Sequence, residues 1–138
     1  MSSSDDDLIE AAREVRERAY APYSRFRVGA ALRLKNGVVV TGVNLESCSY
    51  GLTVCAERNA VATAVAGGAA PGDIEIVAIA AAAERPTPPC GACRQVLAEH
   101  AGAGARVLLY NVRDGAREEM SLAELLPRAF DRGSFTAP

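Results

Sequence analysis

The stretch TVCAERNAVATAVAGG, residues 53–68, predicts a helix that separates two regions of β structure. Its small apolar residues continue from Val54 until the Gly-Gly pair, which is typical of a helix end. Three residues near its start, Cys55, Glu57 and Arg58, interrupt an otherwise alanine-rich run in which Ala or Leu would form a better helix. These three residues therefore require a chemical explanation.

A β-hairpin is predicted before this helix. Residues 26–34, FRVGAALRL, alternate as a strand does, Asn36-Gly37 forms a tight turn, and residues 38–43, VVVTGV, return as the second strand. Residues 44–53 have the composition of a loop. The helix therefore connects the hairpin to whatever strand follows it.

The remaining elements extend this pattern in both directions. Leu8, Ala12, Val15 and Ala19 recur at helical spacing ahead of the hairpin. The segments after the first long helix alternate between apolar strands and short helices. They are a strand at 74–82, a helix from about Cys90 to His100, a strand at 106–110, a strand at about 116–120 and a helix at 121–127.

The order of elements predicts the fold class. The link at 113–115 is too short for a crossover, so the strand after it should pair antiparallel with the strand before it. The order α-β-β-α-β-α-β-β-α then indicates a single-domain α/β protein of residues 1–138, with a five-stranded mixed sheet between helices in three layers. Residues 1–7, rich in Ser and Asp, are expected to form a disordered tail.

Composition excludes several classes of function. The chain has 138 residues and a net charge of −2, which gives no reason to expect a nucleic-acid partner. It has no apolar run of the roughly 20 residues that a membrane helix needs, and its acidic N-terminus does not resemble a signal peptide. We therefore expect a cytoplasmic protein without a membrane partner, whose four cysteines bind metal or catalyse rather than form disulfides.

The positions of three cysteines favour a metal site. Cys55 begins one helix, and Cys90 begins the other, with Cys93 one turn later in PPCGACRQ. By itself the Cys-x-x-Cys pair fits a redox dithiol, half of a structural zinc site or a catalytic zinc site. With Cys55 the chain offers three thiolates, the number of protein ligands that a catalytic zinc keeps while water takes the fourth position.

Glu57 and Arg58 fit a catalytic zinc better than a structural one. In the first helical turn Glu57 can face the same open end as Cys55, where a carboxylate can transfer protons to and from the water. Arg58, three residues after Cys55, can donate to the thiolate sulfurs and draw off their charge. The alternatives are an ordinary acidic residue at a helix start and a surface arginine.

These motifs resemble those of the zinc-dependent cytidine deaminases that act on free nucleosides. CAERNA and PCGACRQVL carry the main resemblance, and APYSRFRVGAAL, GVNLESCSYGLT and LLPRAF extend it over roughly residues 20–130. The signature, a first ligand followed by x-Glu and later by Pro-Cys-x-x-Cys, is a known one for zinc deaminases. A cysteine as first ligand favours the small homotetrameric members.

The resemblance implies a role for each matching residue. It makes Cys55, Cys90 and Cys93 the ligands of one Zn²⁺ per subunit, Glu57 the proton shuttle, and Arg58 a hydrogen-bond donor to the ligand sulfurs. It also implies a set of residues that contact the nucleoside. These are Phe26 and Ala56, Asn44 and Glu46 at the ribose hydroxyls, and Phe130 from a neighbouring subunit.

The implied reaction is the hydrolytic deamination of cytidine and 2'-deoxycytidine to the corresponding uridines, in pyrimidine salvage. The nearest alternative is a deaminase of a related nucleoside such as blasticidin S. A structural zinc module would need Cys48 or His100 as a fourth ligand. We expect Cys48 to be a packed free thiol, and His100 lies about 15 Å from Cys90 at 1.5 Å per helical residue.

Overall fold

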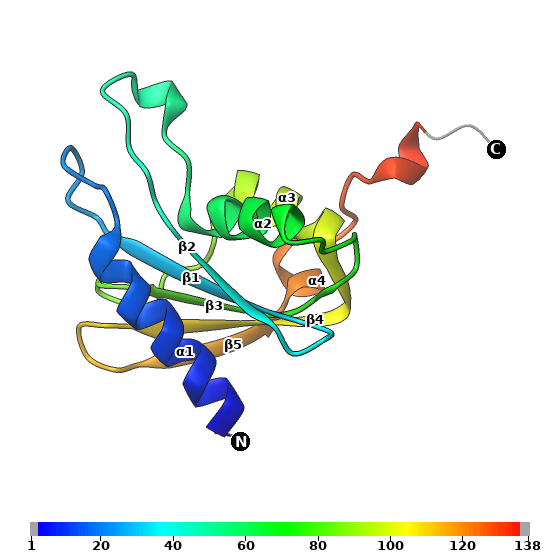
Figure 1. Cartoon of the computed structure of the whole chain (residues 1–138), viewed down its shortest axis with the longest axis horizontal. Helices are drawn as coiled ribbons and strands as arrows, with labels where there is room; N and C mark the ends of the chain where they lie inside the picture. Colours follow the sequence, from blue (N-terminus) through cyan, green and yellow to red (C-terminus); the bar gives the residue numbers. More distant parts are fainter. Residues whose placement is uncertain (1–2, 136–138) are drawn as a thin grey trace.

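Five strands form one mixed sheet in the order β2-β1-β3-β4-β5 (Figure 1). The computed structural model describes residues 3–135. β3 and β4 run parallel, and every other neighbouring pair is antiparallel, including β4 with β5. This confirms the predicted mixed sheet. The strands are β1 (Val28–Leu34), β2 (Val39–Val43), β3 (Ile74–Ala81), β4 (Ala101–Asn111) and β5 (Arg117–Ser121).

Among the described residues, four α-helices cover the two faces of the sheet, which gives the three layers expected from the sequence. α1 lies on one face, while α2, α3 and α4 lie on the other (Figure 1). Short 3₁₀ turns occur at Arg16–Arg18, Tyr50–Leu52 and Arg132–Ser134. The helices are α1 (Ser3–Val15), α2 (Ala56–Ala66), α3 (Gly91–His100) and α4 (Leu122–Leu125).

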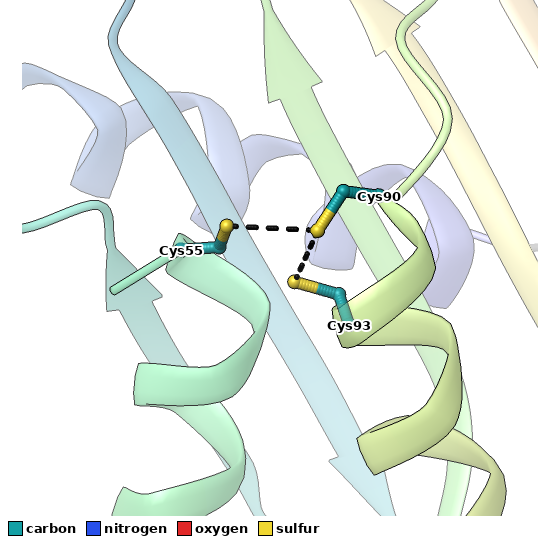
Figure 2. A group of neighbouring side chains, drawn as sticks. All are labelled: Cys55, Cys90 and Cys93. Carbon is teal, nitrogen blue, oxygen red and sulfur yellow. Dashed lines mark hydrogen bonds between the residues drawn. The ribbon is translucent and has the colours of Figure 1, made fainter. Parts of the chain in front are cut away.

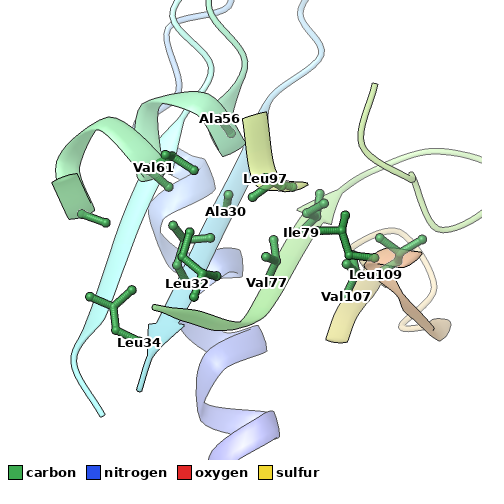
Figure 3. Close-up of a cluster of buried hydrophobic side chains, with 14 residues drawn as sticks. Ala30, Leu32, Leu34, Ala56, Val61, Val77, Ile79, Leu97, Val107 and Leu109 are labelled. Atoms are coloured by element: carbon green, nitrogen blue, oxygen red, sulfur yellow. The ribbon is translucent and has the colours of Figure 1, made fainter. Parts of the chain in front are cut away.

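Side chains that alternate along the central strands divide the core into two clusters. Ala30 and Leu32 of β1 face α2 and α3, whereas Ala31 between them faces α1. The cluster under α2 and α3 contains the larger aliphatic side chains, including Val77, Ile79, Leu97, Val107 and Leu109 (Figure 3). This apolar layer is the base on which the two cysteine-bearing helices rest.

The expectation of a disordered tail at residues 1–7 is wrong for the part that the structure describes. Ser3–Val15 is helical, and Met1 and Ser2 of this tail lie outside the described residues. Acidic side chains in the first turn of α1 pair with arginines of the sheet: Asp5 lies 2.8 Å from Arg106, and Asp6 lies 2.7 Å from Arg117. These ion pairs, together with the favourable position of acidic residues at a helix start, hold the segment on the sheet.

Two glycines allow helices to approach the sheet unusually closely. A Cβ built on Gly42 of β2 would lie 2.4 Å from the amide nitrogen of Ala60 and 2.6 Å from the carbonyl oxygen of Ala56, both in α2. A Cβ on Gly29 would lie 2.1 Å from the carbonyl oxygen of Ala12 in α1. Gly42 therefore fixes the height of α2 above β2 and with it the position of Cys55, the residue before Ala56.

Within residues 3–135, the helices are too short or too polar to cross a lipid bilayer.

Candidate active site

The first turns of α2 and α3 carry the three cysteines that the sequence singled out. Cys55 and Cys90 are the N-cap residues of the two helices, with extended backbone conformations. Their carbonyl oxygens accept the amide protons of Asn59 and Arg94, at 3.1 and 2.9 Å. Neither thiol makes a capping hydrogen bond to its own helix, so both sulfurs can turn toward the gap between the helix ends.

The three sulfur atoms lie together in that gap (Figure 2). Cys55 Sγ is 3.8 Å from Cys90 Sγ, and Cys90 Sγ is 3.4 Å from Cys93 Sγ. All three lie within 4.8 Å of one another. A tetrahedral Zn²⁺ with Zn–S bonds of about 2.3 Å places its sulfur ligands about 3.8 Å apart. The donor atoms and their spacing therefore fit a zinc ion.

The protein environment also favours the thiolate form of Cys55. The pKa of Cys55 is lowered to about 5, by the hydrogen bond from the Cys93 thiol and by the nearby guanidinium of Arg58. Arg58 Nη2 donates to Cys55 Sγ at 3.6 Å, as expected from the sequence. The pKa of Cys93 is raised, because its proton is held by Cys55 and because it is buried next to Glu57. Three thiolates this close to one another need a cation between them.

Glu57 is one of three buried polar or charged residues among the described ones, with only 4% of its surface exposed. Burial raises the pKa of its carboxyl group to about 7, and the thiolate charge of Cys55 acts in the same direction. Cys55, Arg58 and Cys93 all influence the pKa of this carboxyl group, so it lies beside the sulfur cluster. Glu57 is therefore a buried acid that can gain or lose a proton near neutral pH, next to the candidate metal site.

Backbone hydrogen bonds connect the segment that contains Asn44 and Glu46 to the segment that leads into Cys55. Leu45, between them, forms a bridge with Val54, the residue before Cys55. In this structure the Asn44 side chain accepts from the amide of Val28 at 2.9 Å and donates to the carbonyl of Phe26 at 2.8 Å. Asn44 thus orients the backbone that carries Phe26.

Glu46 organises the neighbouring loop. It accepts the amide protons of Tyr23 and Ser24, at 2.9 and 3.1 Å, and the hydroxyl proton of Ser24. The Ser24 hydroxyl oxygen in turn accepts the amide proton of Phe26 at 3.0 Å. Glu46, Tyr23, Ser24, Tyr50 and Thr53 line a shallow pocket beside this loop.

The two aromatic residues expected at the substrate have different surroundings in the single chain. Phe26 is partly exposed, next to the loop that Glu46 holds. Phe130 is 62% exposed and stacks on Phe135 in the C-terminal segment, which leads away from the body of the protein (Figure 1). Ala56 is fully buried at the start of α2. The three cysteines, Glu57 and Arg58 therefore come together within one chain, whereas Phe130 does not join them.

The expectation that Cys48 is a packed thiol is wrong. Cys48 is exposed rather than packed, because the loop that carries it projects from the domain and the described residues do not cover it. Neither Cys48 nor His100 belongs to the sulfur cluster. No role was expected for Arg94 or Ser24 from the sequence, although Arg94 follows Cys93 directly within PCGACRQ and this adjacency could have indicated one.

Fold and site together define a class of protein. A three-layer α/β/α domain presents three thiols from two helix starts, with a buried carboxyl group and a guanidinium beside them. This is the arrangement expected of a zinc-dependent hydrolase that activates water.

Comparison with known proteins identifies the family. The family model for the cytidine and deoxycytidylate deaminase zinc-binding region matches residues 2–109. A cytidine deaminase of Halalkalibacterium halodurans is 51% identical over 123 residues, which cover 89% of this chain and 91% of the relative. The chain belongs to the cytidine and deoxycytidylate deaminase family.

A solved structure and a further relative complete the comparison. The crystal structure of cytidine deaminase from Burkholderia pseudomallei superposes with a TM-score of 0.88 at 46% identity, covering 94% of this chain and all of the other. A blasticidin-S deaminase of Bacillus cereus is 30% identical over 96% of both chains. The fold class expected from the sequence is thereby confirmed.

Proposed function

We propose that this protein catalyses the hydrolytic deamination of cytidine and 2'-deoxycytidine to uridine and 2'-deoxyuridine, with release of ammonia. The observation that carries the proposal is the buried carboxyl group of Glu57 beside three converging thiols. The proteins of similar sequence named cytidine deaminase support the choice of substrate. Cys55, Cys90 and Cys93 would hold one Zn²⁺ per chain.

Glu57 carries the proton transfers in this proposal. When bound, the zinc ion supplies a positive charge that lowers the pKa of a coordinated water. Glu57 takes the proton of the water that attacks C4 of the cytosine ring and delivers it to N3. Glu57 then takes the remaining proton from the oxygen now bonded to C4 and passes it to the exocyclic amine, so that the C4–N bond breaks, a C4=O bond forms and ammonia leaves as a neutral molecule. A pKa of about 7 suits both steps, because the carboxyl group can be emptied and refilled near neutral pH.

Arg58 and the helix starts would draw negative charge away from the ligand sulfurs. The guanidinium donates from Nη2 to Cys55 Sγ, and its Nε is buried without a hydrogen-bond partner among the described residues. The positive ends of α2 and α3 add to this effect. Without these groups, the negative charge of three thiolates would offset the charge of the zinc ion and leave the pKa of the water higher.

The nucleoside would lie between the sulfur cluster and the loop that holds Phe26. Phe26 and Ala56 would contact the base, while Asn44 and Glu46 would bind the ribose hydroxyls. The hydrogen bonds that Glu46 now accepts from Tyr23 and Ser24 show that its carboxylate is a strong acceptor in this loop. Asn44 supports the same surface through the backbone of Phe26.

We further propose a homotetramer in which Phe130 completes the site of a neighbouring subunit. Exposed apolar side chains support an association between copies, since Tyr50, Leu52, Phe130 and Phe135 are each more than 60% exposed in the single chain, with values of 75%, 69%, 62% and 71%. A small nucleoside as substrate, with a role in pyrimidine salvage in the cytoplasm, is consistent with the net charge of −2.

A deaminase of blasticidin S is the second candidate. The relative of that name shares 30% of its residues with this chain, whereas the cytidine deaminase of H. halodurans shares 51%. Identity therefore favours cytidine. An assay on both substrates separates the two candidates.

The direct test is to incubate the purified protein with cytidine and follow the ultraviolet change to uridine, with and without a chelator. We expect conversion that stops when zinc is removed and returns when zinc is added. Full activity in protein shown to be free of metal would contradict the proposal. Turnover of blasticidin S but not of cytidine would replace it with the second candidate.

A further inference from the structure

Arg94, the residue after Cys93, donates hydrogen bonds to two separate segments of the chain, one just before α3 and one at the end of α4. Its Nε donates to the carbonyl oxygen of Pro89 at 2.7 Å, and its Nη1 donates to the carbonyl oxygen of Leu125 at 2.9 Å. The side chain is half-buried between these partners. A charged donor on a neutral acceptor, shielded in part from water, is among the stronger hydrogen bonds in proteins.

The first of these bonds holds the approach to Cys90. Pro89 is fully buried, and its carbonyl belongs to the peptide unit that joins it to Cys90. The orientation of this peptide decides where the Cys90 side chain points. Because Cys90 Sγ lies against both other sulfurs, a rotation of this peptide would separate it from Cys55 and Cys93.

The second bond holds the end of α4, from which the C-terminal segment with Phe130 continues. Leu125 is the last residue of α4, where carbonyl oxygens have no partner within the helix. Arg94 supplies one, as a cation does well at a helix C-terminus. The next residue of α3 acts similarly, since Gln95 Nε2 donates to the carbonyl oxygen of Phe130 at 2.8 Å. Consecutive side chains of α3 therefore bind both ends of residues 125–130, which lie beside α3 in Figure 1.

We propose that Arg94 is a positioning residue that couples the metal site to the segment bearing Phe130. It holds Cys90 at the metal through the Pro89 carbonyl and the root of the segment through the Leu125 carbonyl. The inference rests on the proposed roles of Cys90 as ligand and of Phe130 as a contact to a neighbouring active site. It implies that loss of zinc from one subunit loosens the segment that serves another.

The metal half of the coupling is tested by zinc release from the holoenzyme to a chromogenic chelator. Arg94→Met keeps the aliphatic stem and loses both hydrogen bonds, and we expect release to be about tenfold faster, as for other residues that orient metal ligands. Arg94→Lys retains the charge, so its rate of zinc release should lie between those of Arg94→Met and wild type. If Arg94→Met does not fold, Arg94→Lys serves as the test variant in its place. Arg85→Met, an exposed arginine on the loop before Cys90, is the matched control and should release zinc at the wild-type rate.

The segment half is tested by trypsin cleavage after the exposed Arg128, with products identified by mass spectrometry. In wild type and Arg85→Met, removal of zinc should speed this cleavage several-fold. In Arg94→Met cleavage should already be fast with zinc bound and respond little to its removal.

The outcomes separate this inference from the proposed function. A lower Tm in Arg94→Met with wild-type zinc release and wild-type cleavage would reduce Arg94 to a structural residue and overturn the coupling. Cleavage that responds to zinc equally in Arg94→Met and wild type would do the same. A wild-type protein that holds zinc but does not turn over cytidine would refute the proposed function alone, since neither readout depends on activity.

Discussion

The metal end and the nucleoside-binding surface of this protein are built in different ways. Cys55, Cys90, Cys93 and Glu57 meet at two helix starts that rest on the apolar core, and their geometry is complete within one chain. The residues expected at the nucleoside lie mainly on loops and on the C-terminal segment. Phe26 and Phe130 are exposed, and Asn44 and Glu46 hydrogen-bond to the backbone of residues 23–28.

This difference indicates that turnover and nucleoside affinity depend on different parts of the structure. Backbone atoms of two helices and a close-packed strand fix the sulfurs, so the reactive centre is as rigid as the core beneath it. The binding surface depends on polar contacts between loops and, in our proposal, on a second subunit. Changes at the metal end should therefore alter turnover, and changes at the surface should alter the apparent affinity for nucleoside.

Replacement of Glu57 by Gln should have the largest effect. Gln has nearly the same size and no charge, so the buried site should keep its fold and its zinc, while the proton shuttle is lost. We expect kcat to fall by about 10²–10⁴-fold. Glu84→Gln, an exposed change on the loop before Cys90, is the control. Near-wild-type turnover with a full complement of zinc would remove Glu57 from its proposed role.

Two glycine substitutions compare the faces of the sheet. Gly42→Ala and Gly29→Ala each force a Cβ into the backbone of a helix, and overpacking of this kind costs about 1–3 kcal/mol. Both should lower Tm by several degrees, but only Gly42→Ala displaces the helix that follows Cys55, so only it should also speed zinc release. Gly51→Ala, where a Cβ meets no atom within 4 Å, is the control. Equal zinc release in the two variants would show that the height of α2 does not control the metal site.

Asn44→Ala tests whether the binding surface is held as described. It leaves the amide of Val28 and the carbonyl of Phe26 without partners, a loss of about 1 kcal/mol where water can partly replace them. We expect a modest drop in Tm together with a rise in KM for cytidine and little change in kcat. Asn36→Ala, in the hairpin turn, is the matched control. A fall in kcat without a change in KM would place Asn44 with the reactive centre instead.

The sequence predicted the metal end better than the surface for a physical reason. Cys-x-x-Cys at a helix start and the Cys-x-Glu-Arg run each place their own side chains through local helix geometry. The structure brings the sulfurs of the two runs together across 35 residues, with Arg58 donating to Cys55, and that meeting was expected because the two motifs together resemble a known zinc signature. The contacts of Ser24 and Arg94 join segments 22 and 31 residues apart, and no local pattern encodes them. The expectation of a disordered acidic tail is wrong for the same reason, because Arg106, which binds Asp5 of this segment, lies 101 residues away in the sequence.

The smallest expected effect concerns pH and the Ser24–Glu46 contact. The Ser24 hydroxyl, and then the amides of Ser24 and Tyr23, lower the pKa of Glu46 below that of an unfolded glutamate. Because the ionised form is favoured in the folded state, the resulting stability is present above the unfolded pKa of about 4.3 and is lost as pH falls through the lower folded pKa. Ser24→Ala should therefore lower Tm slightly at pH 7, and the gap to wild type should narrow as pH approaches 3. What remains at acid pH is the loss of the uncharged bond to the amide of Phe26. A gap that stays constant across this range in thermal melts would mean that Ser24 serves Phe26 alone and does not stabilise the charge of Glu46.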